Sequence, residues 1–393
     1  MGQFLGRLSL SDALGLTLAE DVQSDVDSPP HDKSIVDGVA LISAAFAAGK
    51  REFSIGEEIT AGSLPQRVVT SDFAARIMTG APLPDGADAV VMVEKTEAIS
   101  TSPPQVRILE ATVKAGQNIV RRGASMRAGE VVLSRGTLLG GAQIGLLAEV
   151  GCMQPKVYRQ PVVAVLATGN ELVPAESVPA AGQIRNSNGP MLEALVSQAG
   201  GRAVGLGIAR DEEGDLRAHI DKGLSADVLL LSGGVSAGVL DLVPQVLASL
   251  GVQQVFHKVS LKPGKPLWFG ICQRDGRQTL VFGLPGNPVS SLVCFELFVR
   301  PALAKLQGGA PQGLLESTGT LVESHQQRGD RPTYWPVELK EGQGSKLLVR
   351  PLRWQGSGDL FTIGKADGLA YFEPVTNTYE VGEQVRVLRM LRG

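Results

Sequence analysis

Four loops of this 393-residue chain combine glycines with hydroxyl, amide or carboxylate side chains. Glycines let the backbone approach a ligand closely, and carboxylates can hold a divalent cation. Such loops suit a phosphorylated ligand that is bound together with a metal ion. The loops are Thr168-Gly-Asn-Glu171, Ala209-Arg-Asp-Glu-Glu213, Ser232-Gly-Gly-Val-Ser-Ala-Gly238 and Gly283-Leu-Pro-Gly-Asn-Pro288. Their candidate ligand-binding residues are Thr168, Gly169, Ser232, Gly233, Gly234, Ser236, Pro285, Gly286 and Asn287.

Carboxylates and lysines in or near these loops support the same chemistry. Oxygen ligands suit Mg²⁺, and lysines can bind the anionic groups of a phosphorylated ligand. The dinucleotide-binding pattern G-x-G-x-x-G and the P-loop pattern are both absent, so those two kinds of nucleotide site are excluded. Each charge taken alone is typical of a solvated surface, and their grouping at successive strand ends indicates a site. The charged candidates are Glu171, Asp211, Asp241, Lys258, Lys262 and Lys265.

The elements that must position these loops are predicted to alternate between strands and helices. This alternation predicts a mostly parallel sheet that is covered by helices on both faces. Ligands of such sheets bind beyond the carboxyl ends of the strands, so the four loops should meet at one edge. The last helix is expected to run from Val289 to about Leu306, with Asn287 as its N-cap. Buried strands are expected at Val162–Ala167, Asp227–Leu231 and Leu280–Phe282.

The rest of the chain is predicted to form smaller, β-rich domains. Its apolar runs are short and alternating, and Gly, Pro and Asp cluster between them, which is typical of β structure. A helical and extended linker domain is expected from residues 1–24 together with 125–155. An inserted β domain is expected at 25–124, the α/β domain at 156–308 and a C-terminal β domain at 309–393.

Composition excludes several classes of protein. The net charge of −3 argues against a general nucleic-acid binder, which would be basic. The three cysteines are far apart in sequence, which excludes a disulfide framework and a sequence-evident zinc site. No stretch approaches the roughly 20 apolar residues of a membrane span, and the N-terminus lacks the apolar core of a signal peptide. We therefore expect a cytoplasmic protein without a membrane or nucleic-acid partner.

Eight motifs follow one another from about residue 11 to the end of the chain. They read SPPHDKSIVDGVA, RIMTGAPLPDGADAVVMVE, VLATGNELV, IRNSNGPML, LLLSGGVSAG, LKPGKPLWFG, GLPGNPVSS and WQGSGDL. In sequence and in order they resemble the molybdopterin molybdenumtransferases, the MoeA-type molybdenum insertases related to the E domain of gephyrin. The part 156–308 is also similar to single-domain molybdopterin adenylyltransferases, which lack the flanking β domains.

The resemblance implies a fold, a reaction and an assembly. The fold would be a central α/β molybdopterin-binding domain with an inserted small β domain and a C-terminal β domain. The reaction would insert molybdate into adenylated molybdopterin, with Mg²⁺-dependent cleavage of the adenylate and release of AMP. The assembly would be a homodimer whose active site is shared between subunits, and the molybdopterin adenylyltransferase is a candidate partner.

The resemblance also implies roles for single residues. Glu171 and Asp241 would bind the Mg²⁺ that neutralises the departing phosphate, and Asp211 matches a further acid. Lys258 and Lys262 would meet phosphate or molybdate. The other implied positions are Lys265, Ser290 and Ser357 in a molybdate pocket, and Asp37 and Thr79 in the inserted domain.

Several positions depart from the family pattern. Lys33 and Val39 replace an Asn and a Tyr, and Ser125 replaces an acid. An arginine that would bind molybdate is expected to correspond to Pro336, which would remove a bidentate anion donor. With Lys265 and Ser290 retained, we expect a weakened anion pocket.

Three hypotheses about function follow from this pattern. The first is an active insertase, favoured by the retained Glu171, Asp241 and Lys262 and by the intact LPGNPVSS motif. The second is a diverged scaffold or carrier that binds molybdopterin or AMP without turnover, favoured by Ser125 and Pro336. The third is an adenylyltransferase with additional domains.

Overall fold

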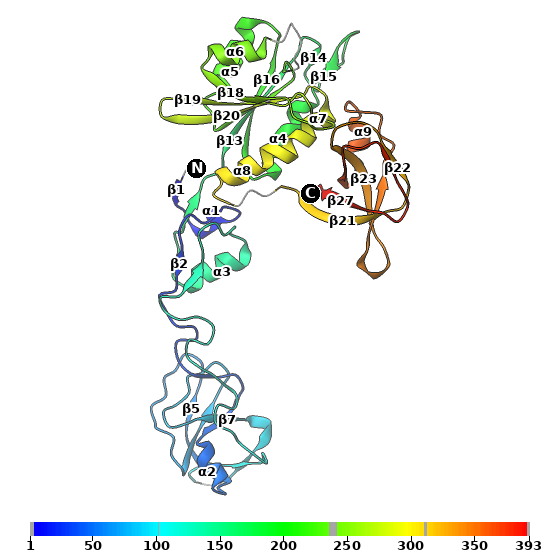
Figure 1. Ribbon diagram of the computed structural model, residues 1–393. Coiled ribbons are helices and arrows are strands. Elements are labelled where there is room, and N and C mark those ends of the chain that lie inside the picture. The colour runs from blue at the N-terminus through cyan, green and yellow to red at the C-terminus, as the bar shows by residue number, and fades with distance from the viewer. Residues whose placement is uncertain (1–3, 101, 236–241, 310–312, 391–393) are drawn as a thin grey trace. The chain divides into compact units, whose positions relative to one another are not determined.

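The computed structural model describes residues 4–100, 102–235, 242–309 and 313–390 (Figure 1). The predicted site residues Ser236 and Asp241 lie outside these described residues. The chain divides into two compact units. The first consists of Met1–Arg7, Gly15–Ala19 and Lys156–Gly393, and the second of Leu8–Leu14 and Glu20–Pro155.

A six-stranded sheet forms the centre of the first unit, in the order β16-β13-β17-β20-β19-β18. The first four strands are parallel to one another, whereas β19 and β18 are antiparallel to their neighbours. The predicted mostly parallel sheet is therefore confirmed, with an antiparallel edge that the sequence pattern did not reveal. The strands are β13 (Val162–Thr168), β16 (Arg202–Ala209), β17 (Val228–Ser232), β18 (Val252–His257), β19 (Trp268–Arg274) and β20 (Arg277–Leu284).

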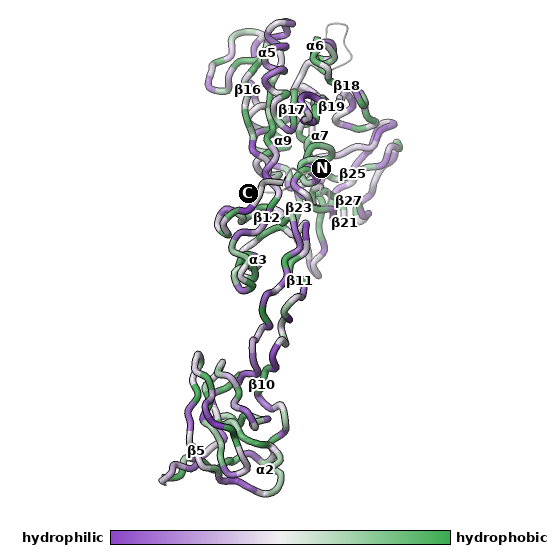
Figure 2. Tube along the Cα trace, turned by 90° about the vertical axis from the view of Figure 1, so that its left-hand side faces the viewer, coloured by the Kyte–Doolittle hydropathy of each residue, from purple (hydrophilic) through white to green (hydrophobic). Residues whose placement is uncertain are grey.

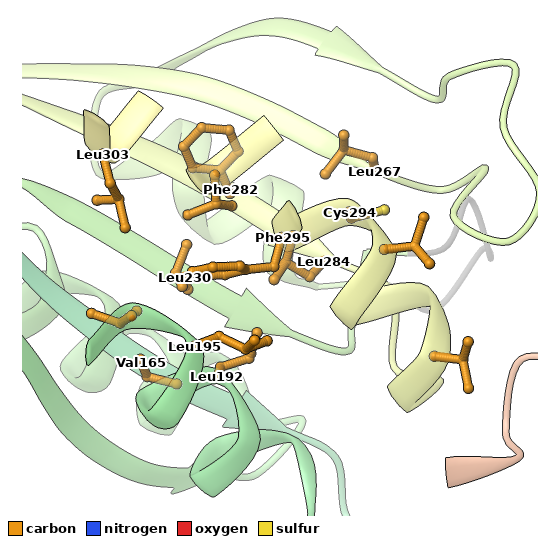
Figure 3. Packing of buried hydrophobic residues seen from close by; sticks show 14 of the residues in the cluster. Val165, Leu192, Leu195, Leu230, Leu267, Phe282, Leu284, Cys294, Phe295 and Leu303 are labelled. Carbon is orange, nitrogen blue, oxygen red and sulfur yellow. The ribbon is translucent and has the colours of Figure 1, made fainter. Parts of the chain in front are cut away.

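Helices cover both faces of this sheet. Helices α4 (Asn188–Gln198), α7 (Pro288–Cys294) and α8 (Arg300–Leu306) pack on one face, where Figure 3 shows the buried side chains that meet between helices and strands. Helices α5 (Glu213–Gly223) and α6 (Val243–Ser249) pack on the other face. Burial on both faces explains why the inner strands read as continuous apolar runs.

The helical segment after β20 runs from Pro288 to Leu306, as predicted. It includes one turn of π-helix, η2 (Phe295–Val299), between α7 and α8. Asn287 occupies the N-cap position with extended backbone angles, but its side chain makes no capping hydrogen bond. Its Nδ2 instead donates to Ser357 Oγ at 2.8 Å. The side chain of Asn287 therefore links the start of α7 to the C-terminal domain.

A buried ion pair lies within this helical segment. Glu296 is 3% exposed and Arg300 is 7% exposed, and Arg300 Nη2 donates to Glu296 Oε1 at 2.9 Å. We expect Glu296→Gln to lower the free energy of unfolding by about 3–5 kcal/mol, because it leaves a buried guanidinium without its counter-charge. The double variant Glu296→Leu/Arg300→Met should be more stable than the single variant. Urea denaturation followed by circular dichroism measures both, and equal stability of Glu296→Gln and the unmodified chain would contradict this assignment.

The C-terminal part of the first unit is a closed five-stranded barrel, in the order β21-β24-β23-β25-β27. Its interior is filled by apolar side chains such as Val337, Val349 and Phe372. The barrel strands are β21 (Leu315–Leu321), β23 (Thr333–Glu341), β24 (Leu347–Pro351), β25 (Gly368–Phe372) and β27 (Gln384–Arg389). Short elements beside them are β22 (His325–Gln327), η3 (Gln343–Ser345), α9 (Leu360–Ile363) and β26 (Asn377–Tyr379).

The second unit is built around another six-stranded sheet, in the order β7-β4-β6-β5-β9-β8. Its strands are β4 (Gly38–Leu41), β5 (Glu52–Ile59), β6 (Phe73–Ile77), β7 (Ala89–Met92), β8 (Thr96–Ile99) and β9 (Gln105–Ile108). Its other elements are α1 (Leu10–Ala13), β2 (Val22–Gln23), β3 (Lys33–Ser34), α2 (Ser43–Ala47), η1 (Val93–Lys95), β10 (Ile119–Val120), β11 (Val131–Leu133) and α3 (Gly141–Glu149).

Two further two-stranded ladders belong to the first unit. They pair β1 (Phe4–Arg7) with β12 (Lys156–Tyr158), and β14 (Leu172–Val173) with β15 (Ile184–Arg185).

Helices mix hydrophobic and hydrophilic residues along their length (Figure 2). Among the described residues, no helix combines the length and the apolar character that crossing a membrane requires.

Candidate functional site

The loops at the carboxyl ends of the parallel strands meet at a large cavity in the first unit. Its volume is about 1410 Å³, and residues of both the α/β domain and the barrel line it. Parallel strands present their carboxyl ends to the same edge, which explains why loops far apart in sequence converge here. The predicted residues that line it are Thr168, Gly169, Glu171, Asp211, Ser232, Gly233, Gly234, Lys262, Lys265, Pro285, Gly286, Asn287, Ser290 and Ser357.

Three predicted residues are not part of this cavity. Lys258 is exposed just after β18, with a φ of 70°, and does not line it. Asp37 and Thr79 belong to the second unit. Lys258 is therefore close to Lys262 and Lys265 in sequence but does not line the cavity with them.

Glycine is required at Gly233 for a specific steric reason. Its φ of 98° lies in the left-handed region, and a Cβ there would approach the backbone oxygen of Thr168 to 2.6 Å. Gly169 has a φ of 149°, which L side chains rarely adopt, and Oε2 of Glu171 lies 2.6 Å from the position that a Cβ would take. The Glu171 carboxylate thus folds back over the backbone of its own loop, at the cavity wall.

A buried asparagine that the sequence analysis did not single out joins two of the loops. Asn188, at the start of α4, is 9% exposed, and its Nδ2 donates to Ser232 Oγ and to the backbone oxygen of Gly286, both at 2.7 Å. Because buried amide groups cost free energy unless they are paired, these bonds fix the loops after β17 and β20 relative to α4. The Asn-Ser-Asn run of residues 186–188 was the sequence signal for this position.

The acidic side of the cavity contains Glu171 and Asp211. Both are exposed, and the two loops are linked by the hydrogen bond from Asp211 N to Asn170 Oδ1 at 3.1 Å. Within the part of the chain that is described, no group of three or more His, Cys, Asp or Glu residues is placed to hold a metal ion. Two carboxylates facing one cavity still fit a hard cation such as Mg²⁺, which takes few protein ligands beside substrate phosphates.

The basic side contains Lys262, Lys265 and an arginine that sequence reasoning missed. Arg331 lines the cavity, its side chain is 32% exposed, and its Nη1 donates to the backbone oxygen of Leu261 at 3.0 Å. Pro336, the position predicted to lack the guanidinium, is buried in β23 and does not line the cavity. Arg331 nevertheless supplies a guanidinium to the cavity. The loss of a molybdate-binding arginine at Pro336 stays a prediction.

Backbone hydrogen bonds hold Arg331 beside the lysines. Lys262 N donates to the backbone oxygen of Pro332 at 2.9 Å, and Tyr334 N donates to the backbone oxygen of Lys262 at 2.8 Å. The start of β23 thus extends along the Lys262–Lys265 loop of the α/β domain. Through this pairing, Arg331 of the C-terminal domain lines the cavity together with the two lysines.

Ser357 is held against the N-terminus of α7. Val289 N donates to its backbone oxygen at 3.0 Å, in addition to the bond from Asn287 to its hydroxyl. Ser290, in the first turn of α7, is 4% exposed and lines the same cavity. Hydroxyls, lysines and a guanidinium therefore converge where a tetrahedral oxyanion could be bound.

In the second unit, Asp37 and Thr79 form a hydrogen-bonded pair. The backbone N–H and the hydroxyl of Thr79 both donate to Asp37 Oδ1 at 2.7 Å. The backbone bond first, and the hydroxyl second, lower the pKa of Asp37 below its ordinary value. This carboxylate is accordingly anionic at neutral pH.

Three family models match successive parts of the chain. The "MoeA N-terminal region (domain I and II)" matches residues 5–151, the "Probable molybdopterin binding domain" matches 164–305, and the "MoeA C-terminal region (domain IV)" matches 318–390. The chain is 38% identical to a molybdopterin molybdenumtransferase of Staphylococcus epidermidis, over 97% of this chain and 90% of that protein. It is 33% identical to the Bacillus subtilis enzyme of the same name, over 97% of this chain and 89% of that protein.

Solved structures show the same similarity. A molybdopterin biosynthesis MoeA protein from Pyrococcus horikoshii superimposes with a TM-score of 0.81 at 32% identity, covering 98% of this chain and 93% of that one. A second structure from the same organism gives 0.82 at 27% identity, covering 99% and 95%. These matches confirm the resemblance and the predicted multidomain fold.

Proposed function

Because the chain belongs to the MoeA family of molybdopterin molybdenumtransferases, we propose that it inserts molybdate into adenylated molybdopterin and releases AMP. One observation supports this most. A single cavity holds carboxylates suited to a cation on one side, and lysines, a guanidinium and hydroxyls suited to an oxyanion on the other. The alternatives of a non-catalytic scaffold and of an adenylyltransferase are not favoured, since the chain matches molybdenumtransferases over nearly its full length.

The charges of the cavity account for both parts of the reaction. Glu171 and Asp211 would hold Mg²⁺, with Asp241 as a further ligand, and the bound cation would supply charge that stabilises the leaving phosphate. Lys262, Lys265 and Arg331 would bind and orient molybdate beside the dithiolene. Hydrolysis of the phosphoanhydride takes up one water and gives AMP and molybdopterin phosphate. When the dithiol form of the dithiolene binds molybdate through both sulfurs, its two protons leave with one oxo ligand as water.

The direct assay is incubation with adenylated molybdopterin, Mg²⁺ and molybdate, with AMP release and active cofactor followed together. We expect AMP release that requires molybdate and falls when Mg²⁺ is removed by a chelator. AMP release that is absent, or that is unaffected by molybdate, would contradict the proposal. Formation of the adenylate from ATP would support the adenylyltransferase instead.

We further propose a homodimer whose active site combines Asp37 of one chain with Glu171 of the other. Variants Asp37→Ala and Glu171→Ala should each be nearly inactive, yet a co-expressed heterodimer of the two should retain about half of the normal activity, because one of its two composite sites is intact. Two different affinity tags allow the heterodimer to be purified and assayed.

The outcome of this mixing experiment is decisive for the shared site. An inactive heterodimer of folded chains would place Asp37 and Glu171 in the site of one subunit. Full activity of Asp37→Ala alone would remove Asp37 from the site altogether. The cytoplasmic location and an association with the adenylyltransferase also stay predictions, which cell fractionation and co-purification can test.

A further inference from the structure

Two of the three tryptophans of the chain line the cavity, and the reaction as described above gives them no role. Trp335 lies in β23, and Trp354 lies just before the turn that carries Ser357. The third, Trp268, is 2% exposed in the core on the other face of the sheet. Both cavity tryptophans are only partly buried, so their rings form part of the wall that a ligand meets.

The two rings are arranged as a corner. Their centroids are 4.9 Å apart and their planes are perpendicular, at 90°. Trp335 is fixed, because its Nε1 donates to the backbone oxygen of Leu352 at 2.9 Å. The Nε1 of Trp354 is buried and has no hydrogen-bond partner among the described residues. Trp354 is therefore held by packing alone, and it can adjust to a ligand without breaking a hydrogen bond.

The strand order places this corner away from the carboxylates. Glu171 follows β13 and Asp211 follows β16, which lie at one end of the sheet. The Lys262–Lys265 loop connects β18 to β19 at the opposite end, and it is this loop that pairs with the start of β23. A ligand that spans the cavity thus passes from the carboxylates, along the loops after β17 and β20, to the lysines and the barrel.

Adenylated molybdopterin contains two ring systems, adenine and pterin. Only the pterin matches the order of groups from the carboxylates to the barrel. In adenylated molybdopterin the phosphoanhydride separates adenosine from the part that carries the dithiolene and the pterin. When a cation at Glu171 and Asp211 holds the phosphates, and the oxyanion-binding groups hold molybdate at the dithiolene, the pterin lies on the side of the barrel. Aromatic side chains bind flat heterocycles by stacking.

We propose that Trp335 and Trp354 form the binding site for the pterin ring, with Trp354 as the stacking partner and Trp335 as its fixed support. This inference rests on the proposed function and deepens it, because it assigns the ring-binding part of the same site. The tryptophans position the dithiolene beside Lys265 and Arg331 and take no part in bond making. Discrimination between pterin and other flat rings then depends on the barrel, whereas AMP is bound by the α/β domain.

Binding measured without molybdate tests the proposal separately from turnover. Adenylated molybdopterin and AMP are the two probes, and isothermal titration under anaerobic conditions gives each Kd. Trp354→Ala should raise the Kd of adenylated molybdopterin by about 10-fold or more, as expected for the loss of one stacked ring. It should leave the Kd of AMP unchanged. Trp354→Phe should stay within about 3-fold of the unmodified chain, because phenylalanine still offers a ring face. Trp268→Phe is the matched control outside the cavity.

Fluorescence supplies an independent readout. Adenylated molybdopterin should quench tryptophan emission in the unmodified chain and in Trp268→Phe, and this quenching should be lost in Trp335→Phe/Trp354→Phe. If Trp354→Ala raised the Kd of AMP and the Kd of adenylated molybdopterin equally, adenine would be the ring bound between Trp335 and Trp354. That result would overturn the proposal. Unchanged affinity for both probes would overturn it as well. Because no molybdate is present, these results do not depend on whether insertion itself is observed.

Discussion

Replacement of Glu171 by glutamine is expected to slow AMP release on the order of 10²–10³-fold, the range seen when one preorganised electrostatic group is removed from an active site. Glutamine keeps the size of the side chain but removes the charge that would attract Mg²⁺ to the phosphates. Glu171 is exposed at the cavity wall, so the substitution should leave the stability of the fold nearly unchanged. Single-turnover AMP release and urea denaturation, measured on the same sample, separate these two effects.

Glu176→Gln is the matched control for this experiment. Glu176 is also exposed, lies between β14 and β15, and does not line the cavity. Its loss should leave AMP release unchanged, and raising the Mg²⁺ concentration should partly restore the Glu171 variant only. A Glu171→Gln variant with the full rate would place the cation site elsewhere.

Replacement of Arg331 by alanine is expected to raise the molybdate concentration for half-maximal rate about 10- to 100-fold, because charge-assisted hydrogen bonds contribute about 1.5–3 kcal/mol each. The guanidinium is held by the backbone oxygen of Leu261, so it is oriented before the anion arrives. Lysine at this position should restore only part of the affinity, since an ammonium group cannot form two parallel hydrogen bonds. Initial rates of AMP release against molybdate concentration give the half-maximal concentration for the unmodified chain, for Arg331→Ala and for Arg331→Lys.

Arg353→Ala controls for the loss of one positive charge from the same domain. Arg353 is exposed and does not line the cavity. It should leave the molybdate dependence unchanged. If Arg331→Ala and Arg353→Ala behaved alike, the guanidinium of Arg331 would have no specific role in oxyanion binding.

Much of the site could be predicted from the sequence because it depends on a regular sheet. Loops such as Thr168–Glu171 and Gly283–Pro288 follow parallel strands, and parallel strands end at one edge. Their convergence therefore follows from strand–helix alternation alone. The strand and helix of residues 277–306 were likewise recognisable from an apolar run, a Gly/Pro-rich turn and a helical pattern.

The contributions of the barrel could not be predicted in this way. Arg331 and Trp335 reach the cavity because the start of β23 pairs with the backbone around Lys262, a tertiary contact that leaves no periodic signal. Sequence reasoning assigned the missing arginine to Pro336, although Pro336 is buried within the strand. Asn287 was interpreted as a helix cap from its type and position, but its bond to Ser357 depends on how the barrel docks.

We expect molybdate to be bound for insertion in the cavity between the α/β domain and the barrel. Crystals grown with molybdate, with diffraction data collected at the molybdenum absorption edge, test it most directly. We predict one anomalous peak within hydrogen-bonding distance of Arg331 and of Lys265 or Ser290, and a weaker peak in Arg331→Ala crystals at the same molybdate concentration. A peak found only outside this cavity, or no peak at saturating molybdate, would contradict the assignment of the site.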